Sequence, residues 1–393
     1  MSNTLGTVSM GIRAPIIQQG DDVVSIVVDS VLTAAKENNF ILQDKDIVCL
    51  TESVLARAQG NYATLEQIAA DVRAKFDNNE TVGLVFPILS RNRFSLILKG
   101  IAMGVKKLVV QLSYPGDEVG NRLIDIEQLD DLGINPAISH FTSTEFNKLF
   151  PNAKHFFTGI DYIDYYKNLG GNIEVILSND LKHILKYTKS VITADIHTRE
   201  RSKRILLKAG AKKVFSVADI LNKSIEDSGY HPEYGLLGSN LATENTVKLF
   251  PRDADEFCTK LQTYFKKATG KSLECMVYGD GAFKDPIGGI WELADPVVSP
   301  GFTSGLEGQP NELKIKYIAD NDLAGLEREE AMLEMKKRIA SKNKMQQTDN
   351  QSLGTTPRRL VDLIGSLCDL TSGSGDKGTP IVLVQNYFKN YAE

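Results

Sequence analysis

The chain has 393 residues, of which 42% are hydrophobic and 24% charged, and its formal net charge is −5. This length exceeds the roughly 250–300 residues at which a single hydrophobic core tends to split, so we expect two lobes. No apolar run is long enough to span a bilayer, no secretory signal is recognisable and no long basic run is present, so we expect a cytoplasmic protein that binds neither membranes nor nucleic acid.

The first hundred residues predict alternating helices and strands. After an opening loop, apolar residues recur at helical spacing over residues 23–36, and either aspartate of Gly20-Asp21-Asp22 could cap this helix. A short buried strand is predicted over residues 47–50, ending in Thr51-Glu52-Ser53. The remaining predictions are helices over residues 65–76 and 94–103, with a strand over residues 81–88 between them.

The central part of the chain has the pattern of a parallel sheet. Strands are predicted over residues 107–112, 173–177, 190–194 and 213–216, with helices over residues 180–187 and 198–209. Such a β-α-β order is typical of a Rossmann-like, three-layer segment. Because no G-x-G-x-x-G motif follows these strands, we infer no dinucleotide there. The segment could instead serve packing or oligomerisation.

The last third mixes helices, strands and loops. The predicted order is a helix over 257–268, a strand over 273–278, a Pro- and Gly-rich loop over 291–308, a charged helix over 322–344, a polar linker over 345–356, a helix over 358–370 and a strand over 380–384.

Cysteine and histidine spacing argues against a structural transition-metal site. The four cysteines lie far apart without a C-x-x-C pair, and the five histidines lack zinc-like spacing. We therefore expect reduced, buried cysteines, and oxygen ligands for any metal.

The run 278–286 is the strongest local motif. An apolar strand delivers Asp280 to its carboxyl end, where open α/β sheets tend to bind ligands. Asp280 and Asp285 could ligate Mg²⁺ or Mn²⁺, and Gly281 would let a phosphate approach closely. On composition alone, an ordinary tight turn is the more common outcome for such a run.

Two further segments could bind anions. The Gly-rich run 370–378 could surround an anion with backbone N–H groups while Lys377 adds a charge, or it could be a flexible connection. Its spacing differs from that of a Walker A loop. Arg91 and Arg93, with Asn92 between them, could clamp a carboxylate or phosphate, although solvated surface charge is the more common outcome. No Ser-His-Asp or Cys-His set supports a hydrolase with a covalent nucleophile.

Taken in order, short motifs of the chain resemble those of the F420-0:gamma-glutamyl ligase family. The motifs are Gly11-Ile12-Arg13-Ala14-Pro15, Gly20-Asp21-Asp22, the runs 44–48 and 51–60, Gly238-Ser239-Asn240, and the runs 247–251, 277–286 and 378–382. The resemblance implies a mixed α/β (α+β) fold. Residues 1–105 and 227–393 would form a ligase-like core, and residues 106–226 an inserted, Rossmann-like α/β segment.

The resemblance also implies an activity and a set of site residues. The family joins L-glutamate to an acceptor carboxylate through an acyl phosphate, using GTP and a divalent metal. For this chain it implies a GTP- or ATP-dependent acid–amino-acid ligase with Mg²⁺ or Mn²⁺, acting as a homodimer on a small carboxylate such as F420-0 or a folate. By matching position, the implied residues are Gly11, Ile12, Glu52, Ser53, Arg57, Asn240 and Gly375 at the nucleotide, Asp280 and Asp285 at the metal, and Asp280, Arg57 and Lys377 in catalysis. The run Arg91-Asn92-Arg93 has no family counterpart and is where we expect acceptor contacts.

One departure from the family pattern opens alternatives. The family's aspartate three residues before its motif asparagine falls on Leu237, so a metal ligand is missing unless Glu244 or Asp285 replaces it. The chain could therefore be a catalytically inactive nucleotide- or metabolite-binding protein. It could also be another carboxylate-activating transferase on the same scaffold.

Overall fold

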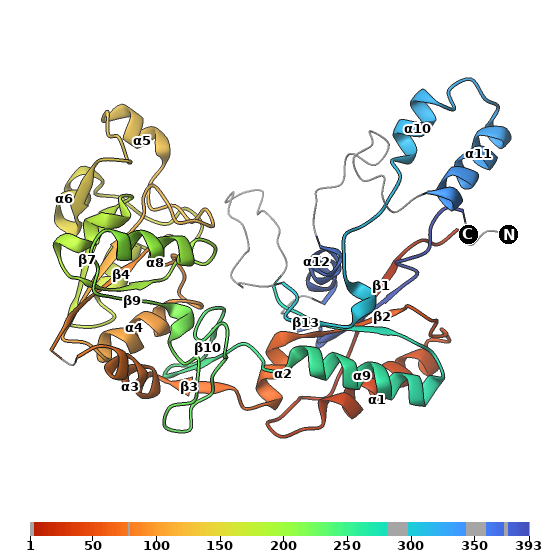
Figure 1. The fold of residues 1–393 in the computed structure, drawn as a ribbon, viewed down its shortest axis with the longest axis horizontal. Helices are drawn as coiled ribbons and strands as arrows, with labels where there is room; N and C mark the ends of the chain where they lie inside the picture. Colours follow the sequence, from red (N-terminus) through yellow and green to blue (C-terminus); the bar gives the residue numbers. More distant parts are fainter. Residues whose placement is uncertain (1–3, 78, 281–297, 343–358, 373–375, 393) are drawn as a thin grey trace.

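The protein folds into two lobes joined by a small sheet (Figure 1). The computed structural model describes residues 4–77, 79–280, 298–342, 359–372 and 376–392. In the first lobe, a five-stranded sheet contains the first and the last described strands, and in the second lobe a six-stranded sheet carries the central part of the chain. A three-stranded sheet lies between the two lobes.

The strands of the first lobe bring several chain segments to one sheet edge. In spatial order they are β1 (Val8–Ile12), β14 (Ile381–Gln385), β2 (Ile47–Thr51), β12 (Glu274–Tyr278) and β13 (Gly301–Phe302). Strand β14 runs antiparallel to both β1 and β2, and β12 runs parallel to β2. The carboxyl ends of β1, β2 and β12 therefore share one edge with the start of β14.

Alternating side chains bury both faces of this sheet. Val48 and Leu50 contribute to the core with the helices on one face, while Ile47 and Cys49 pack with the helix on the other. The helices are α1 (Val23–Glu37), α2 (Glu52–Ala58) and α9 (Ala254–Thr269) on the first face and α12 (Leu360–Ser372) on the second (Figure 1). Helix α1 starts at Asp22, whose carboxylate accepts from Ser25 N at 3.3 Å.

The second lobe is built on a mostly parallel sheet. Its strands, in spatial order, are β6 (His140–Thr142), β7 (Ile173–Ser178), β5 (Lys107–Leu112), β4 (Thr81–Val85), β8 (Ser190–Thr193) and β9 (Lys213–Ser216). Only β6 runs antiparallel to its neighbour in this described sheet. The helices are α3 (Leu65–Lys75), α4 (Ser95–Met103), α5 (Ile126–Asp131), α6 (Ser143–Leu149), α7 (Tyr162–Lys167), the 3-10 helix η1 (Leu181–Lys186) and α8 (Arg199–Lys208).

The linking sheet is where the chain passes between the lobes. Its strands, in spatial order, are β10 (Asn240–Thr243), β11 (Thr246–Lys248) and β3 (Tyr62–Thr64). Strand β3 leads from α2 into α3, and β11 leads back toward α9. The buried side chains of Ala63 and Val247 belong to the core of the second lobe.

Most of the predicted helices and strands are confirmed within a few residues, and three predictions are wrong. The opening segment is not a loop, because β1 pairs with β14. The strand predicted over 81–88 ends at Val85, because Phe86 adopts φ 58° and leaves the strand conformation. The charged helix predicted over 322–344 starts only at Arg328, as α11 (Arg328–Ser341), and a separate short helix, α10 (Ile315–Asn321), precedes the predicted range. The predicted linker 345–356 lies outside the described residues, as does the first part of the predicted loop 291–308.

The mixed α/β class is confirmed, since several sheets are covered by helices. Strand β4, within the residues assigned to the ligase-like core, pairs with β5 and β8 in the second lobe. The division into a core and an inserted Rossmann-like segment stays a prediction. All four cysteines are buried and free, as expected. Among the described helices, none has the length and apolar character needed to cross a bilayer.

Candidate functional site

One edge of the five-stranded sheet collects residues from four separated motifs. Tyr278 is aligned with Thr51, Leu50 with Ile381, and Ile381 with Ile12, so these strand ends lie side by side. The segments that leave or enter them contain Arg13, Glu52, Asp280 and residues 376–379. Because neighbouring strands lie about 4.8 Å apart, the three steps from β1 to β12 span roughly 14 Å. Such an edge is where open α/β sheets place ligands.

A half-buried lysine connects this edge to the linking sheet. The Lys248 ammonium, on β11, donates a hydrogen bond to Ser53 Oγ at the start of α2. Burial lowers the pKa of Lys248; the negative charge of Glu52 opposes this effect, and the positive charges of Arg57 and Arg93 reinforce it. Four charged side chains from three parts of the chain therefore act on one another here.

The predicted nucleotide residues Glu52, Ser53, Arg57 and Asn240 lie around this lysine. Asn240, on β10, is aligned directly with Lys248 on the neighbouring strand. Sequence motifs alone do not single out Lys248. A signal for it exists, because Val247 and Leu249 are buried and strand alternation turns Lys248 to the opposite face.

An ion pair between the lobes completes the cluster. Arg93, in the turn before α4 of the second lobe, pairs with the carboxylate of Asp280, which follows β12 of the first lobe. Beside it, Leu241 N donates to Asn92 O at 2.9 Å, so the turn also contacts β10. The charge of Arg91, two residues earlier in the same turn, acts on the Tyr162 hydroxyl instead. The predicted acceptor residues therefore have different partners: Arg93 pairs with Asp280 of the first lobe, whereas Arg91 acts on Tyr162 within the second lobe.

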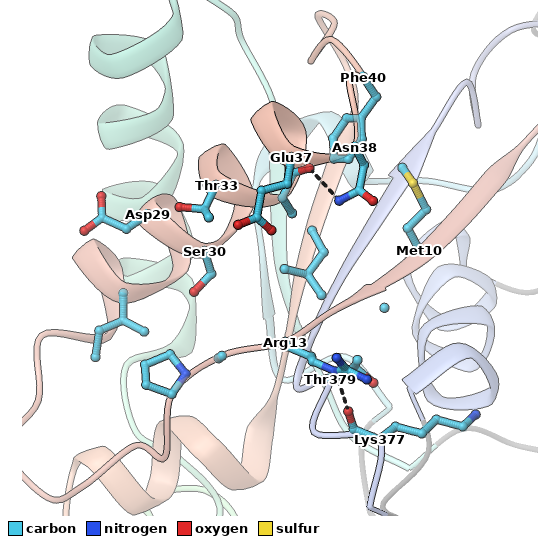
Figure 2. Close-up of a pocket in the computed structure, with 16 residues that line it drawn as sticks. Met10, Arg13, Asp29, Ser30, Thr33, Glu37, Asn38, Phe40, Lys377 and Thr379 are labelled. Atoms are coloured by element: carbon cyan, nitrogen blue, oxygen red, sulfur yellow. Dashed lines mark hydrogen bonds between the residues drawn. The ribbon is translucent and has the colours of Figure 1, made fainter.

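Gly11, Ile12 and Lys377 line a groove farther along the same sheet edge. The groove, of about 1090 Å³, runs between β1 and α1 (Figure 2). Arg13 Nε donates to Lys377 O at 3.4 Å, which ties the chain after β1 to the segment before β14. A Cβ atom on Gly11 would lie 3.0 Å from Thr379 Cβ, so a larger residue would push these segments apart. The predicted nucleotide residues therefore occupy two places along one edge.

The described residues do not form a ready-made metal cage. Within them, no group of three His, Cys, Asp or Glu side chains is placed to hold an ion. Asp280 is engaged by Arg93, and the predicted Asp285 and Gly375 lie outside the described residues. Leu237 is buried in the apolar core of the second lobe, and Glu244 is exposed in the turn between β10 and β11. The described residues alone therefore do not supply a complete metal site.

The site thus combines three cations, Arg57, Arg93 and Lys248, with the ion-paired carboxylate of Asp280. Such a set at the ends of strands suits ligands that carry several negative charges. A family model described as F420-0:Gamma-glutamyl ligase matches residues 11–386. The matched range includes the central segment 106–226. A comparison with curated proteins gives no match.

Proposed function

Because the chain belongs to the F420-0:gamma-glutamyl ligase family, we propose that it joins L-glutamate, or a similar amino acid, to a small carboxylate acceptor such as F420-0 or a folate. GTP or ATP is the phosphoryl donor, and the enzyme acts as a homodimer. The observation that carries the proposal is the cluster of Arg57, Arg93 and Lys248 beside Asp280. A reaction with three anionic participants needs such cations at its centre.

The proposed reaction has two steps. An oxygen of the acceptor carboxylate attacks the γ-phosphorus, so that an acyl phosphate forms and the nucleoside diphosphate leaves. The amine of glutamate then attacks the acyl carbon, the amide bond forms, and inorganic phosphate leaves while the amine loses a proton. Negative charge shifts onto leaving oxygens in both steps, and fixed cations lower the energy of both transition states.

The charged side chains divide these tasks by position. Lys248, beside the start of α2, and Arg57, in the last turn of α2, bind the phosphates, and Glu52 and Asn240 orient these two cations. Arg93, which reaches across from the second lobe, binds the acceptor carboxylate. Lys377, in the groove along β1, binds the distal part of the nucleotide.

A divalent ion is part of the proposal. Mg²⁺ commonly binds through one or two carboxylates together with substrate phosphates, so Asp280 with Asp285 suits an ion that arrives with the nucleotide. When bound, Mg²⁺ or Mn²⁺ would neutralise phosphate charge.

A second candidate function is nucleotide or metabolite binding without catalysis. It is favoured by Leu237, an apolar, buried residue at the position where the family has an aspartate. A different carboxylate-activating transferase on the same scaffold would share the first step and use another nucleophile.

Phosphate release distinguishes these functions. The protein is incubated with GTP or ATP, Mg²⁺ or Mn²⁺, glutamate and candidate acceptors, including F420-0 and folates. We expect release that requires both glutamate and an acceptor. Release that requires an acceptor but a nucleophile other than glutamate would identify the transferase. Nucleotide binding without acceptor-dependent release under every condition would contradict the ligase and identify the binding protein.

A further inference from the structure

Two neighbouring aromatic side chains project into solvent on the second lobe. Phe156 is 75% exposed and Phe157 57% exposed. They line a pocket of about 260 Å³ together with the exposed cations Arg122 and Lys154. Adjacent exposed aromatic rings at a concave surface are typical of a binding site, because large apolar side chains otherwise gain by burial.

The loop that carries Phe156 and Phe157 is fixed by hydrogen bonds of the buried His155. His155, beneath them, is buried, and its Nδ1 accepts from Thr158 N at 3.1 Å. Its Nε2 lies 3.1 Å from Asn121 Oδ1. Burial lowers the pKa of His155, in keeping with a neutral ring that accepts at Nδ1 and donates at Nε2. His155 N also donates to Ile160 O at 2.8 Å. The aromatic pair is therefore presented by a fixed loop.

The same part of the chain fixes the turn 88–93 that ends at Arg93. Tyr166, on α7, accepts from Ser90 N at 3.0 Å and donates to Ile88 O at 2.6 Å. The hydroxyl of Tyr162, at the start of α7, is hydrogen-bonded to the Thr158 side chain and the Arg91 backbone. The pocket loop and the arginine turn are thus anchored to one short helix.

A second set of hydrogen bonds connects the pocket loop to the turn 88–93. The half-buried carboxylate of Asp117 accepts from Leu89 N at 2.8 Å and from Asn121 Nδ2 at 2.8 Å. Asn121 in turn contacts His155 below the aromatic pair. Two independent sets of hydrogen bonds therefore hold the pocket in a fixed position relative to the turn that carries Arg91 and Arg93.

We propose that this pocket binds a planar aromatic ring that carries an anionic group, and that this ligand is the acceptor of the ligase. The ring lies against Phe156 and Phe157, and its anionic group faces Arg122 and Lys154. Asp125, which pairs with Arg122 at 3.5 Å, leaves one net positive charge among these three groups. Identification of the ligand as the acceptor rests on the proposed function, whereas recognition of an aromatic anion rests on the pocket alone.

Binding is tested on the full chain with flavin mononucleotide as the probe, followed by its fluorescence. Riboflavin, which has the same ring system without phosphate, is the matched ligand. We expect saturable binding of flavin mononucleotide and weaker binding of riboflavin. Phe156→Ala and Phe157→Ala should each weaken the binding of both ligands about tenfold, since each removes one aromatic face on which the ring stacks. Arg122→Gln should weaken flavin mononucleotide and leave riboflavin unchanged.

Ile138→Ala is the control variant, because Ile138 is 70% exposed in the same lobe but is not among the residues lining the pocket. Its affinity for the probe should match that of the wild type. Absence of saturable binding up to the solubility limit of the probe would overturn the proposal, as would equal affinities of the wild type and both phenylalanine variants.

In the ligase reaction, Phe156→Ala should raise the KM for the acceptor and leave the KM for the nucleotide unchanged. An unchanged KM for the acceptor would show that the ligand of this pocket is not the acceptor, while the pocket would still bind an aromatic anion. Probe binding without any ligase turnover would contradict the proposed function while the pocket assignment stands.

Discussion

At the scale of single residues, Lys248 has the properties expected of a phosphate ligand. Burial removes water from its ammonium group, yet Ser53 Oγ accepts one hydrogen bond and Glu52 supplies a nearby negative charge. A cation with little competing water interacts more strongly with a bound anion than an exposed lysine does. The neighbouring positive charges of Arg57 and Arg93 repel the Lys248 ammonium, and a bound anion would relieve this repulsion.

Replacement of Lys248 by methionine should lower kcat about 100-fold, the typical effect of removing one charge-stabilising group from an active site. Methionine keeps an unbranched side chain of similar length, so packing beside α2 is largely preserved. Acceptor-dependent phosphate release measures the effect. Lys260→Met is the control, because Lys260 is exposed on α9 and pairs there with Glu256. Wild-type turnover in Lys248→Met would exclude Lys248 from the phosphate site.

The pH profile gives the same residue a second, more specific readout. Because its pKa is lowered, Lys248 loses its proton at a lower pH than an exposed lysine, so phosphate release should fall on the alkaline side as this proton is lost. Arginine stays protonated over that range, and Lys248→Arg should therefore move the alkaline decline to higher pH. An identical decline in both proteins would assign the titration to another group.

At the scale of elements, the linking sheet depends on one buried side chain. Asn61 precedes β3 and donates from Nδ2 to Phe250 O at 2.6 Å and to Tyr230 O at 3.1 Å. Its Oδ1 accepts from Tyr230 N at 3.0 Å and from the guanidinium of Arg252. Leu249 N also donates to Asn61 O at 2.9 Å. Asn61 thus fixes the chain after β11 against the chain before β3, and with it the position of Lys248.

Asn61→Ala should destabilise the protein by about 2–4 kcal/mol, because several buried backbone groups and the Arg252 guanidinium lose their partner. The measurement is the urea midpoint of unfolding, followed by circular dichroism. Asn152→Ala, a change at an exposed position of the second lobe, serves as the control and should leave the midpoint unchanged. If the Asn61 variant unfolds at the wild-type midpoint, the linking sheet is held by its strand pairing and core contacts instead.

The elements differ in how far the sequence predicts them. Helix α1 and strand β2 are predicted because their apolar spacing reports directly which face is buried. The three linking strands have only three or four residues each and several polar side chains, so local periodicity is weak. They form because distant segments pair, with Tyr62 aligned to Lys248. Strand β1 was missed for a related reason, since as an edge strand it is only partly buried.

At the scale of the whole molecule, the site depends on how the two lobes are placed. Motif order assigns Glu52, Arg57 and Asn240 to one site, whereas Lys248, near which they lie, is brought there by pairing across the linking sheet. The ion pair of Arg93 with Asp280 has no signal in local sequence, because it joins two lobes. Gly11 and Lys377 lie along the same edge in a separate groove, which spacing along the chain does not reveal.

Asp280→Asn should lower turnover about 100-fold while thermal unfolding stays close to that of the wild type, because the side chain is 41% exposed and lies at a strand end. Phosphate release and circular dichroism measure the two effects. Unchanged activity would place Asp280 outside the reaction.

The loss could arise from chemistry or from weakened contact between the lobes, and exchange of the two charges separates these causes. The double variant Arg93→Asp with Asp280→Arg keeps an opposite-charge pair at the junction but reverses which lobe presents the cation. If the pair serves only to hold the lobes together, the exchange restores turnover, and small-angle scattering gives the wild-type radius of gyration. We expect the scattering to match that of the wild type while turnover stays low, because the acceptor carboxylate would then meet an aspartate where it needs Arg93.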